Sequence, residues 1–216
     1  MRRSLARVLT LAALIPLALS RAMNKPETGA IIGAGAGGAA GDVIGHATGS
    51  TVRGAIIGAV VGGAAGAVIG HQMDKQAQEL AYDLPGAVVQ RVGEGITVTF
   101  PEGLLFGFDS DQINSAAQGN LRRFAASLQK YPNTRTLIVG HTDSEGSADY
   151  NMDLSNRRAL SAANFITGEG VDRARISTAG RGESEPIATN TSDAGRQLNR
   201  RVEVAIYADA ATRGGQ

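Results

Sequence analysis

The chain has 216 residues, a formal net charge of +1 and no cysteine. This length allows one packed domain of ordinary size together with a smaller segment. The near-neutral charge gives no electrostatic reason to expect nucleic acid as a partner. The absence of cysteine excludes disulfides, thiolate metal sites and thiol nucleophiles, and also a lipidated N-terminal cysteine in the sequence as written.

Residues 1–20 have the pattern of a signal peptide. Arg2, Arg3 and Arg7 supply positive charge, residues 8–19 form an apolar run, and Ser20 follows it as a small residue suited to cleavage. The apolar run is shorter than the roughly 20 residues that a transmembrane helix needs. We therefore expect export across the inner membrane, with an uncleaved N-terminal anchor as the alternative.

A glycine-rich duplication follows within residues 21–75. Residues 29–46, GAIIGAGAGGAAGDVIGH, recur at 54–71 as GAIIGAVVGGAAGAVIGH, with fifteen of eighteen positions identical. Glycine recurs at every fourth position in both copies, and Ser50-Thr51-Val52-Arg53 between them has the composition of a turn. The pattern predicts a glycine-zipper helical hairpin, because glycine at this spacing lets two helices approach closely.

Such a hairpin needs a partner, because each glycine costs a helix about 1 kcal/mol relative to alanine. Close packing or a lipid environment has to offset that cost. Asp42 argues against full membrane insertion of the first copy, since a charge at the bilayer centre costs about 3 kcal/mol. We expect residues 29–70 to engage a membrane or to form a homo-oligomer. A flexible glycine-alanine linker is the alternative.

Residues 76–210 have the composition of an α/β domain, and residues 211–216 that of a disordered tail. Gly93-Glu94-Gly95 separates two alternating segments and predicts a hairpin. An apolar stripe that includes Leu121, Phe124 and Leu128 predicts an amphipathic helix that ends before Pro132. The expected elements are strands at 87–91 and 96–100, a helix at 113–130, a strand at 135–141, a helix at 150–167, a strand at 176–180, a short helix at 192–198 and a strand at 201–207. This order predicts an α+β sandwich, a small mixed sheet with helices on one face, preceded by the glycine-rich helical hairpin.

Several motifs of this domain resemble those of the OmpA-like domain family. The central ones are GHTDSEG at 140–146 and YNMDLSNRRA at 150–159. Shorter blocks agree in order and spacing: FGFDS at 106–110, GVD at 170–172, GRGE at 180–183, PIA at 186–188 and NRRVE at 199–203. The resemblance covers roughly residues 80–207 and implies an OmpA-like fold. It also implies a peptidoglycan-binding protein that holds the stem peptide, typically at meso-diaminopimelate.

Carried over by motif position, the resemblance implies that Asp143 receives the ammonium of the ligand and Arg158 its carboxylate, and that Asn151 and Arg200 complete the pocket. The residue types suit this role, because arginine binds a carboxylate through two hydrogen bonds and a carboxylate side chain pairs with an ammonium. Asn151 and Arg158 lie two helical turns apart on one stripe. The alternative for Asp143 and Arg158 is a structural salt bridge between them. Arg201 is expected to point away from the site, since neighbours in a strand alternate sides.

The sequence gives no sign of catalysis or of a cofactor. His141, Asp143 and Ser144 are adjacent along an extended segment, which does not produce a catalytic triad, and the three histidines form no metal-binding pattern. We expect a non-enzymatic tether between the outer membrane and the cell wall, on the periplasmic face of the outer membrane of a Gram-negative bacterium. The alternative is a structural assembly protein whose main functional element is the glycine zipper.

Overall fold

The computed structural model describes residues 49–61, 67–107 and 109–209. The signal peptide expected at 1–20, the first glycine-rich copy and the expected tail at 211–216 lie outside these residues. The elements, in chain order, are α2 (Thr51–Val61), α3 (Ala67–Asp83), β1 (Val88–Val92), β2 (Gly95–Pro101), α4 (Glu102–Leu105), α5 (Ser115–Lys130), β3 (Thr134–His141), α6 (Ala148–Gly168), the 3-10 turn η1 (Arg173–Arg175), β4 (Ile176–Gly180), α7 (Asp193–Asn199) and β5 (Arg201–Ala208).

The strands form one mixed sheet in the order β1-β2-β5-β3-β4. Only the β3–β4 pair is parallel, and α6 connects these two strands. The predicted hairpin is formed by β1 and β2, and Gly93 adopts the positive φ of 54° that its tight turn requires. The α+β class and the mixed sheet predicted from the sequence are confirmed.

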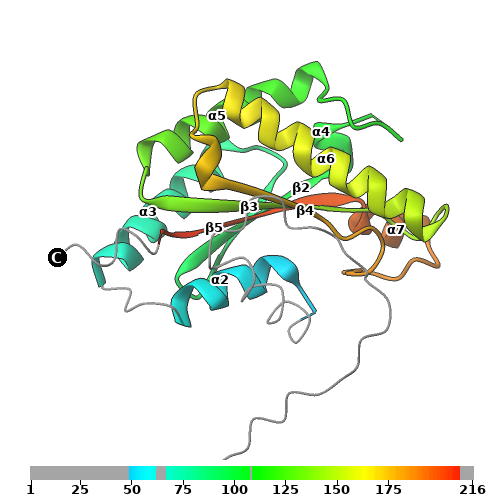
Figure 1. The fold of residues 1–216 in the computed structure, drawn as a ribbon, viewed down its shortest axis with the longest axis horizontal. Helices are drawn as coiled ribbons and strands as arrows, with labels where there is room; N and C mark the ends of the chain where they lie inside the picture. The colour runs from blue at the N-terminus through cyan, green and yellow to red at the C-terminus, as the bar shows by residue number, and fades with distance from the viewer. Residues whose placement is uncertain (1–48, 62–66, 108, 210–216) are drawn as a thin grey trace, which may run out of the picture.

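The larger core lies on the face of the sheet that α3, α5 and α6 cover (Figure 1). The apolar stripe predicted for α5 is buried there, with Leu121 at 1% exposure and both Phe124 and Leu128 at 0%. Phe124 meets Phe100 of β2 edge to face, with 5.8 Å between the ring centroids. This face therefore matches the predicted packing of helices on one side of a small sheet.

The opposite face of the sheet is covered by α2 (Figure 1). The sequence analysis predicted a helix in this region but not its packing against the sheet. Val52, Ala55 and Ile56, each at most 4% exposed, share one side of this helix. They pack against residues of three strands, namely Leu137, Val139, Ala179 and Ala205. The turn expected at 50–53 is a misprediction, because Thr51 already begins α2. Helices consequently cover both faces of the sheet.

The N-terminal end of α2 is fixed by polar contacts to the loop after β4. The backbone N–H of Thr51 donates to both carboxylate oxygens of Glu185, at 3.2 and 3.1 Å, and its hydroxyl donates to Oε1 at 2.5 Å. The Nε atom of Arg181 donates to the same hydroxyl at 2.6 Å. A carboxylate beside the first N–H groups of a helix also interacts favourably with the helix dipole. These contacts orient the start of α2 against the sheet.

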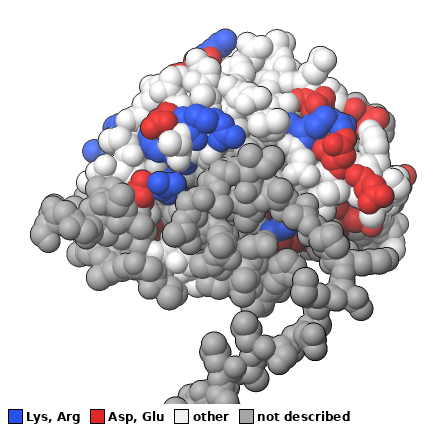
Figure 2. Space-filling model, in the orientation of Figure 1, with Lys and Arg blue, Asp and Glu red and all other residues white. Residues whose placement is uncertain are grey.

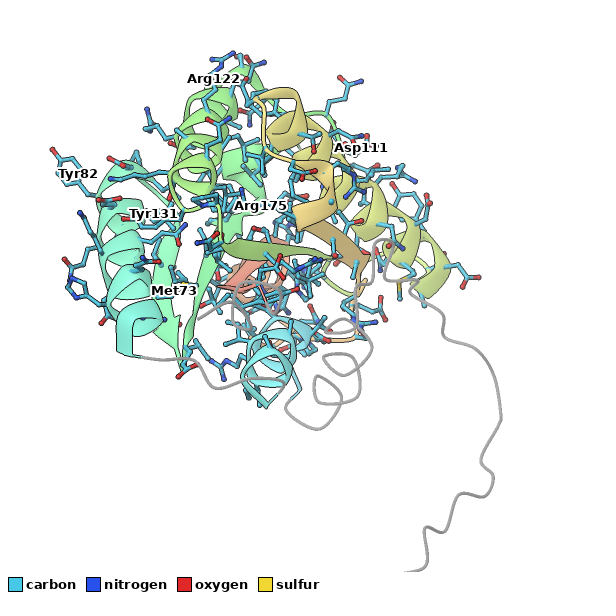
Figure 3. All side chains as sticks on the ribbon, turned by 60° about the vertical axis from the view of Figure 1, so that its left-hand side comes forward. Met73, Tyr82, Asp111, Arg122, Tyr131 and Arg175 are labelled. Carbon is cyan, nitrogen blue, oxygen red and sulfur yellow. The ribbon has the colours of Figure 1, made fainter. Side chains whose placement is uncertain are left out.

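The boundary expected at residue 76 falls inside α3. Met73, at 2% exposure, and Leu80, at 0%, both belong to the larger core, whereas Tyr82 on the far side of the helix is 90% exposed (Figure 3). Gln76 is buried and donates to the hydroxyl of Ser127 at 3.3 Å. The packed unit therefore includes residues on both sides of the expected boundary.

Two glycines bring α6 close to the ends of β3 and β4. A Cβ atom at Gly140 would lie 2.1 Å from the carbonyl oxygen of Ser155, and one at Gly180 would lie 2.5 Å from the hydroxyl of that residue. Only glycine permits this approach. The helix itself begins after Ser147, whose side chain accepts a hydrogen bond from the N–H of Tyr150. This packing fixes the helix that supplies two of the predicted site residues.

Among the residues that the structure describes, no helix combines the length and the apolarity that crossing a membrane requires.

Candidate functional site

The candidate site lies where β3 ends and α6 begins. Asp143 follows β3 by two residues, and its Oδ1 accepts a hydrogen bond from the N–H of Glu145 at 3.0 Å, which closes the turn of the loop. Asn151 and Arg158 project from the buried side of α6. Arg200 lies between α7 and β5. These elements bring together side chains that are far apart in the sequence.

All four predicted site residues line one pocket of about 390 Å³. Its lining consists of Glu102, Asp109, Thr142, Asp143, Glu145, Tyr150, Asn151, Leu154, Arg158, Asp193, Arg196 and Arg200. Figure 2 shows acidic and basic groups side by side at the end of the molecule where α6 and α7 lie in Figure 1. The pocket thus combines both signs of charge, as a zwitterionic ligand requires.

Four charged side chains of alternating sign form the inner wall of this pocket. Arg158 donates through Nη2 to Oε1 of Glu102, and Arg200 donates through Nε to Oε2 of the same carboxylate at 2.6 Å. Arg200 also donates through Nη1 to Oδ2 of Asp143 at 2.5 Å. We call Arg158, Glu102, Arg200 and Asp143 the charged quartet. Its formal charges sum to zero, so the inner wall is electrically balanced.

Arg158 is nearly buried, at 1% exposure, and is held on several sides. Its Nε atom donates to the carbonyl of Ser110 at 2.9 Å, and its guanidinium carbon lies 5.5 Å from the centroid of the Phe106 ring. A planar guanidinium suits such a position, because it stacks on an aromatic ring while donating within its own plane.

Arg200 is the more open of the two arginines, with 24% of its side chain exposed. Burial lowers the pKa of its guanidinium, but the hydrogen bonds and charges of Asp143 and Glu102 outweigh burial and raise the pKa above its ordinary value. Arg200 therefore stays charged and pairs with both neighbouring carboxylates.

Lining residues other than the charged quartet have their own polar contacts. Asn151 donates to Oε2 of Glu183 at 2.7 Å, and the hydroxyl of Tyr150 donates to Oδ1 of Asp109 at 2.5 Å. Arg196 pairs with Glu145 at 3.3 Å and also with Asp193. Glu145 and Asp193 are exposed and outnumber Arg196, so this exposed side of the pocket, which we call its entrance, is acidic.

The structure tests the alternative interpretation of Asp143 and Arg158, a salt bridge between them. No ion pair joins these two side chains among the described residues; each is paired with another member of the charged quartet. The interpretation as a mutual salt bridge is therefore wrong. Sequence analysis missed Glu102, which lies outside the recognised motifs and carries no local signal of a site.

Two neighbouring residues face away from the pocket. Arg201, as predicted, points to the other side, where it donates to Glu203 at 2.8 Å and to the carbonyl of Glu185 at 3.0 Å. His141 is buried at 1% exposure, and neither ring nitrogen has a hydrogen-bond partner among the described residues. Burial, with Arg201 and Arg181 nearby, lowers the pKa of His141 well below its ordinary value. His141 is thus a neutral core residue.

The described residues provide no obvious place for a metal ion, since no three histidine or acidic side chains among them are grouped as ligands.

The fold is a mixed five-stranded sheet, and the pocket of paired acids and arginines lies between the parallel crossover and the last strand. This combination is that of an OmpA-like domain. The chain belongs to the OmpA family, which it matches over residues 105–200. Residues 1–74 match the YMGG-like Gly-zipper family. The family predicted from the motifs is confirmed.

Among curated proteins, the chain resembles lipoproteins of bacterial envelopes. It is 39% identical to a probable lipoprotein, YiaD of Escherichia coli, over 56% of this chain and 55% of the relative. It is 31% identical to a peptidoglycan-associated lipoprotein of Agrobacterium fabrum over 62% of this chain and 76% of the relative. The chain therefore spans about half of YiaD and about three quarters of the Agrobacterium protein.

Solved structures agree with the fold. The cell wall anchor of the T6SS from Pseudomonas aeruginosa superposes with a TM-score of 0.56 at 33% identity, over 62% of this chain and 97% of that chain. A periplasmic domain of Helicobacter pylori MotB superposes with a TM-score of 0.53 at 28% identity, over 61% of this chain and 85% of that one. The likeness covers about three fifths of the chain in both cases.

Proposed function

We propose that this protein binds peptidoglycan non-covalently through the diaminopimelate of the stem peptide, and thereby tethers the bacterial envelope to the cell wall. The observation that supports the proposal most directly is that Asp143, Asn151, Arg158 and Arg200 line one open pocket. Relatives described as a peptidoglycan-associated lipoprotein and as a cell wall anchor support the same function.

The chemistry of the pocket fits the free end of diaminopimelate, which presents an ammonium and a carboxylate on one carbon. Asp143, next to the acidic entrance, would receive the ammonium, and Arg158 would receive the carboxylate. Individual charged contacts of this kind contribute a few kcal/mol at most, and less where solvent reaches them. Reversible attachment to an abundant polymer is consistent with contributions of that size.

Co-sedimentation of the full chain with purified sacculi tests the proposal. Asp143→Asn removes the charge for the ammonium at constant size, and Arg158→Lys keeps a positive charge while removing the planar fork. Both changes should reduce the bound fraction severalfold. We prefer lysine to alanine at residue 158, since alanine would leave the buried Glu102 carboxylate without this partner.

Neighbouring residues outside the pocket provide matched controls. Arg157 is adjacent to Arg158 but has 41% of its side chain exposed and pairs with Asp153 and Asp111. Arg157→Lys and Asp153→Asn repeat the two chemical changes away from the pocket and should leave the binding unchanged. Undiminished binding by a folded Asp143→Asn, Arg158→Lys double variant would refute the proposal.

We propose further that the protein has no catalytic activity of its own. Among the described residues, the pocket lining contains no histidine and no serine, and its inner carboxylates are paired with arginines. Incubation of sacculi with the purified chain should release no muropeptides. Release that Asp143→Asn abolishes would overturn this part of the proposal.

We infer an outer-membrane location on its periplasmic face, with attachment or self-association provided by residues that precede α2. The envelope lipoproteins among the relatives support the location. Since α2 packs against the sheet of its own domain, a deletion that tests attachment should remove residues 29–48 and spare 49–61. Loss of membrane fractionation by this deletion, with sacculus binding retained, is expected. A change from oligomer to monomer in detergent, without loss of fractionation, would favour the assembly role.

A further inference from the structure

Glu102 lies between the two arginines of the pocket and is itself largely buried, at 8% exposure. One carboxylate oxygen accepts from Arg158 and the other from Arg200. The backbone around it is fixed independently, because the N–H of Glu102 donates to the carbonyl of Arg200 at 3.0 Å. Glu102 is therefore already the carboxylate partner of both arginines, and its side chain can be changed without removing its backbone contact.

The hydrogen-bonding of Arg158 limits what a ligand can do while Glu102 stays in place. Nε donates to Ser110 and Nη2 donates to Glu102, and among the described residues Nη1 has no acceptor. A guanidinium binds a carboxylate at two points through either Nε and Nη2 or Nη1 and Nη2. Both arrangements use Nη2. Because Nη2 carries two N–H groups, a two-point contact with Arg158 as the structure shows it would place the ligand carboxylate beside that of Glu102, with both sharing this nitrogen.

We propose that the Glu102 carboxylate is an internal competitor for the carboxylate of the ligand, and that it sets how strongly the pocket distinguishes a free acid from its amide. The proposal rests on the function proposed above and identifies a residue that determines specificity within that site. A two-point contact between Arg158 and the ligand either brings a second carboxylate next to Glu102 at Nη2 or moves Glu102 away from Nη2 toward Arg200. Repulsion between the carboxylates, or the loss of that hydrogen bond, reduces the benefit that a free carboxylate brings.

Stem peptides occur with the diaminopimelate carboxylate free or amidated, and the pocket of the native chain should distinguish them only weakly. The charged quartet is already neutral, and the acidic entrance of the pocket disfavours an additional anion. Glu102→Gln keeps the shape of the side chain and removes one negative charge. Among the described residues, Arg158 then has no carboxylate partner, so the free acid should gain affinity relative to the amide.

Calorimetric titration of the full chain with two synthetic tripeptides tests this inference. The probes are L-alanyl-γ-D-glutamyl-diaminopimelate with the terminal carboxylate of the diaminopimelate side chain either free or amidated. The measured quantity is the ratio of the two association constants, because any general weakening of ammonium binding cancels in it. Glu102→Gln should raise this ratio by about fivefold or more.

Glu145→Gln is the matched control. Glu145 lines the same pocket, but 71% of its side chain is exposed and its ion pair is with Arg196. Removing its charge should change the ratio by less than about twofold, since exposed charges are screened. An equal rise in both variants would show a general charge effect and would refute the specific role of Glu102.

The native chain offers a second measurement that does not depend on the folding of a variant. In NMR titrations, the free acid should shift the side-chain Nε resonance of Arg158 and the carboxyl carbon resonance of Glu102, and the amide should shift them much less. Equal shifts with both probes, or an unchanged ratio in a folded Glu102→Gln variant, would overturn the inference alone. Failure of the native chain to bind either probe would instead refute the proposed function.

Discussion

The packing of α2 against the sheet makes Ile56 a quantitative test of the architecture. Ile56 is 1% exposed and contacts the apolar surface formed by β3, β4 and β5. Its chain neighbour Ile57 is 40% exposed. The two residues are chemically identical, so Ile56→Ala and Ile57→Ala differ only in what the side chain contacts.

Burial gives the expected size of the effect. Ile56→Ala removes three carbon atoms, at roughly 0.8 kcal/mol each, or about 2.4 kcal/mol of transfer free energy. The cavity adds to this loss, and the total reaches about 3 kcal/mol. For a domain of this size, 1 kcal/mol shifts Tm by about 2–4 °C, so the variant should melt roughly 6–12 °C lower. Ile57→Ala should change stability by about 0.5 kcal/mol or less.

Thermal and urea unfolding of the full chain, followed by circular dichroism, measure this difference. Hydrogen exchange of the β3 amides adds a local measurement, since detachment of α2 would expose that strand from one side. Equal melting temperatures for the two variants would refute the reasoning, because they would mean that residue 56 is no more buried than residue 57 in solution.

Substitutions in other elements should also change stability in ways that follow from the structure. Since the pKa of His141 is lowered in the folded state, the unfolded chain binds a proton near pH 6.5 that the folded chain does not. The free energy of unfolding, measured in urea, should therefore fall below that pH by up to about 1.4 kcal/mol per pH unit. His141→Gln should reduce this slope. A slope unchanged by the substitution would contradict the assignment. Gly140→Ala should cost about 3 kcal/mol or more, because its Cβ atom would overlap the backbone of α6. Gly119→Ala at a half-buried position of α5, where a Cβ atom would meet only the Arg123 side chain at 3.9 Å, should instead raise the free energy of unfolding by about 0.5–1 kcal/mol. Arg175→Ala should cost about 2–4 kcal/mol in the same unfolding assay, because the guanidinium donates to three backbone carbonyls. Arg122→Ala, at an exposed ion pair, should cost about 0.5 kcal/mol. Equal losses for both variants would refute a stabilising role of the three carbonyl contacts.

Most of the helices and strands were predictable because each has a local signal. The glycines at 93 and 95 give the hairpin, and the stripe through Phe124 gives α5. The predicted start of α6 at Tyr150 was late by two residues, because capping by Ser147 begins the helix at Ala148. The helix α4 was missed, since four residues are too few for an apolar periodicity to show.

The position of α2 was not predictable from its own sequence. Its regular glycine spacing indicates that the helix packs closely against something, but does not identify the partner. A signal was present in β3, however. Leu137, Ile138 and Val139 are consecutive apolar residues, and side chains alternate between the faces of a strand. Ile138 belongs to the larger core, while Leu137 and Val139 belong to the core under α2. A strand that is apolar on both sides needs a cover on each face.

The site was predictable to the extent that its residues belong to motifs. Asp143, Asn151 and Arg158 lie in two adjacent blocks, and Arg200 lies in a third. Their common position in one pocket follows from the fold. Glu102 was not predictable, because an acidic residue after a proline at the end of a strand has many ordinary explanations, and only the tertiary structure places it between two arginines.

The contacts at the start of α2 also distinguish the two glycine-rich copies, whose sequences are nearly identical. GAIIG occurs at 29–33 and again at 54–58, but Pro26 and Glu27 occupy the repeat positions that correspond to Thr51 and Val52. A proline has no N–H to donate to Glu185, and a glutamate would bring an unpaired charge to a position where Val52 is 1% exposed. The two residues just before the repeat therefore give the second copy, but not the first, the groups that these contacts require.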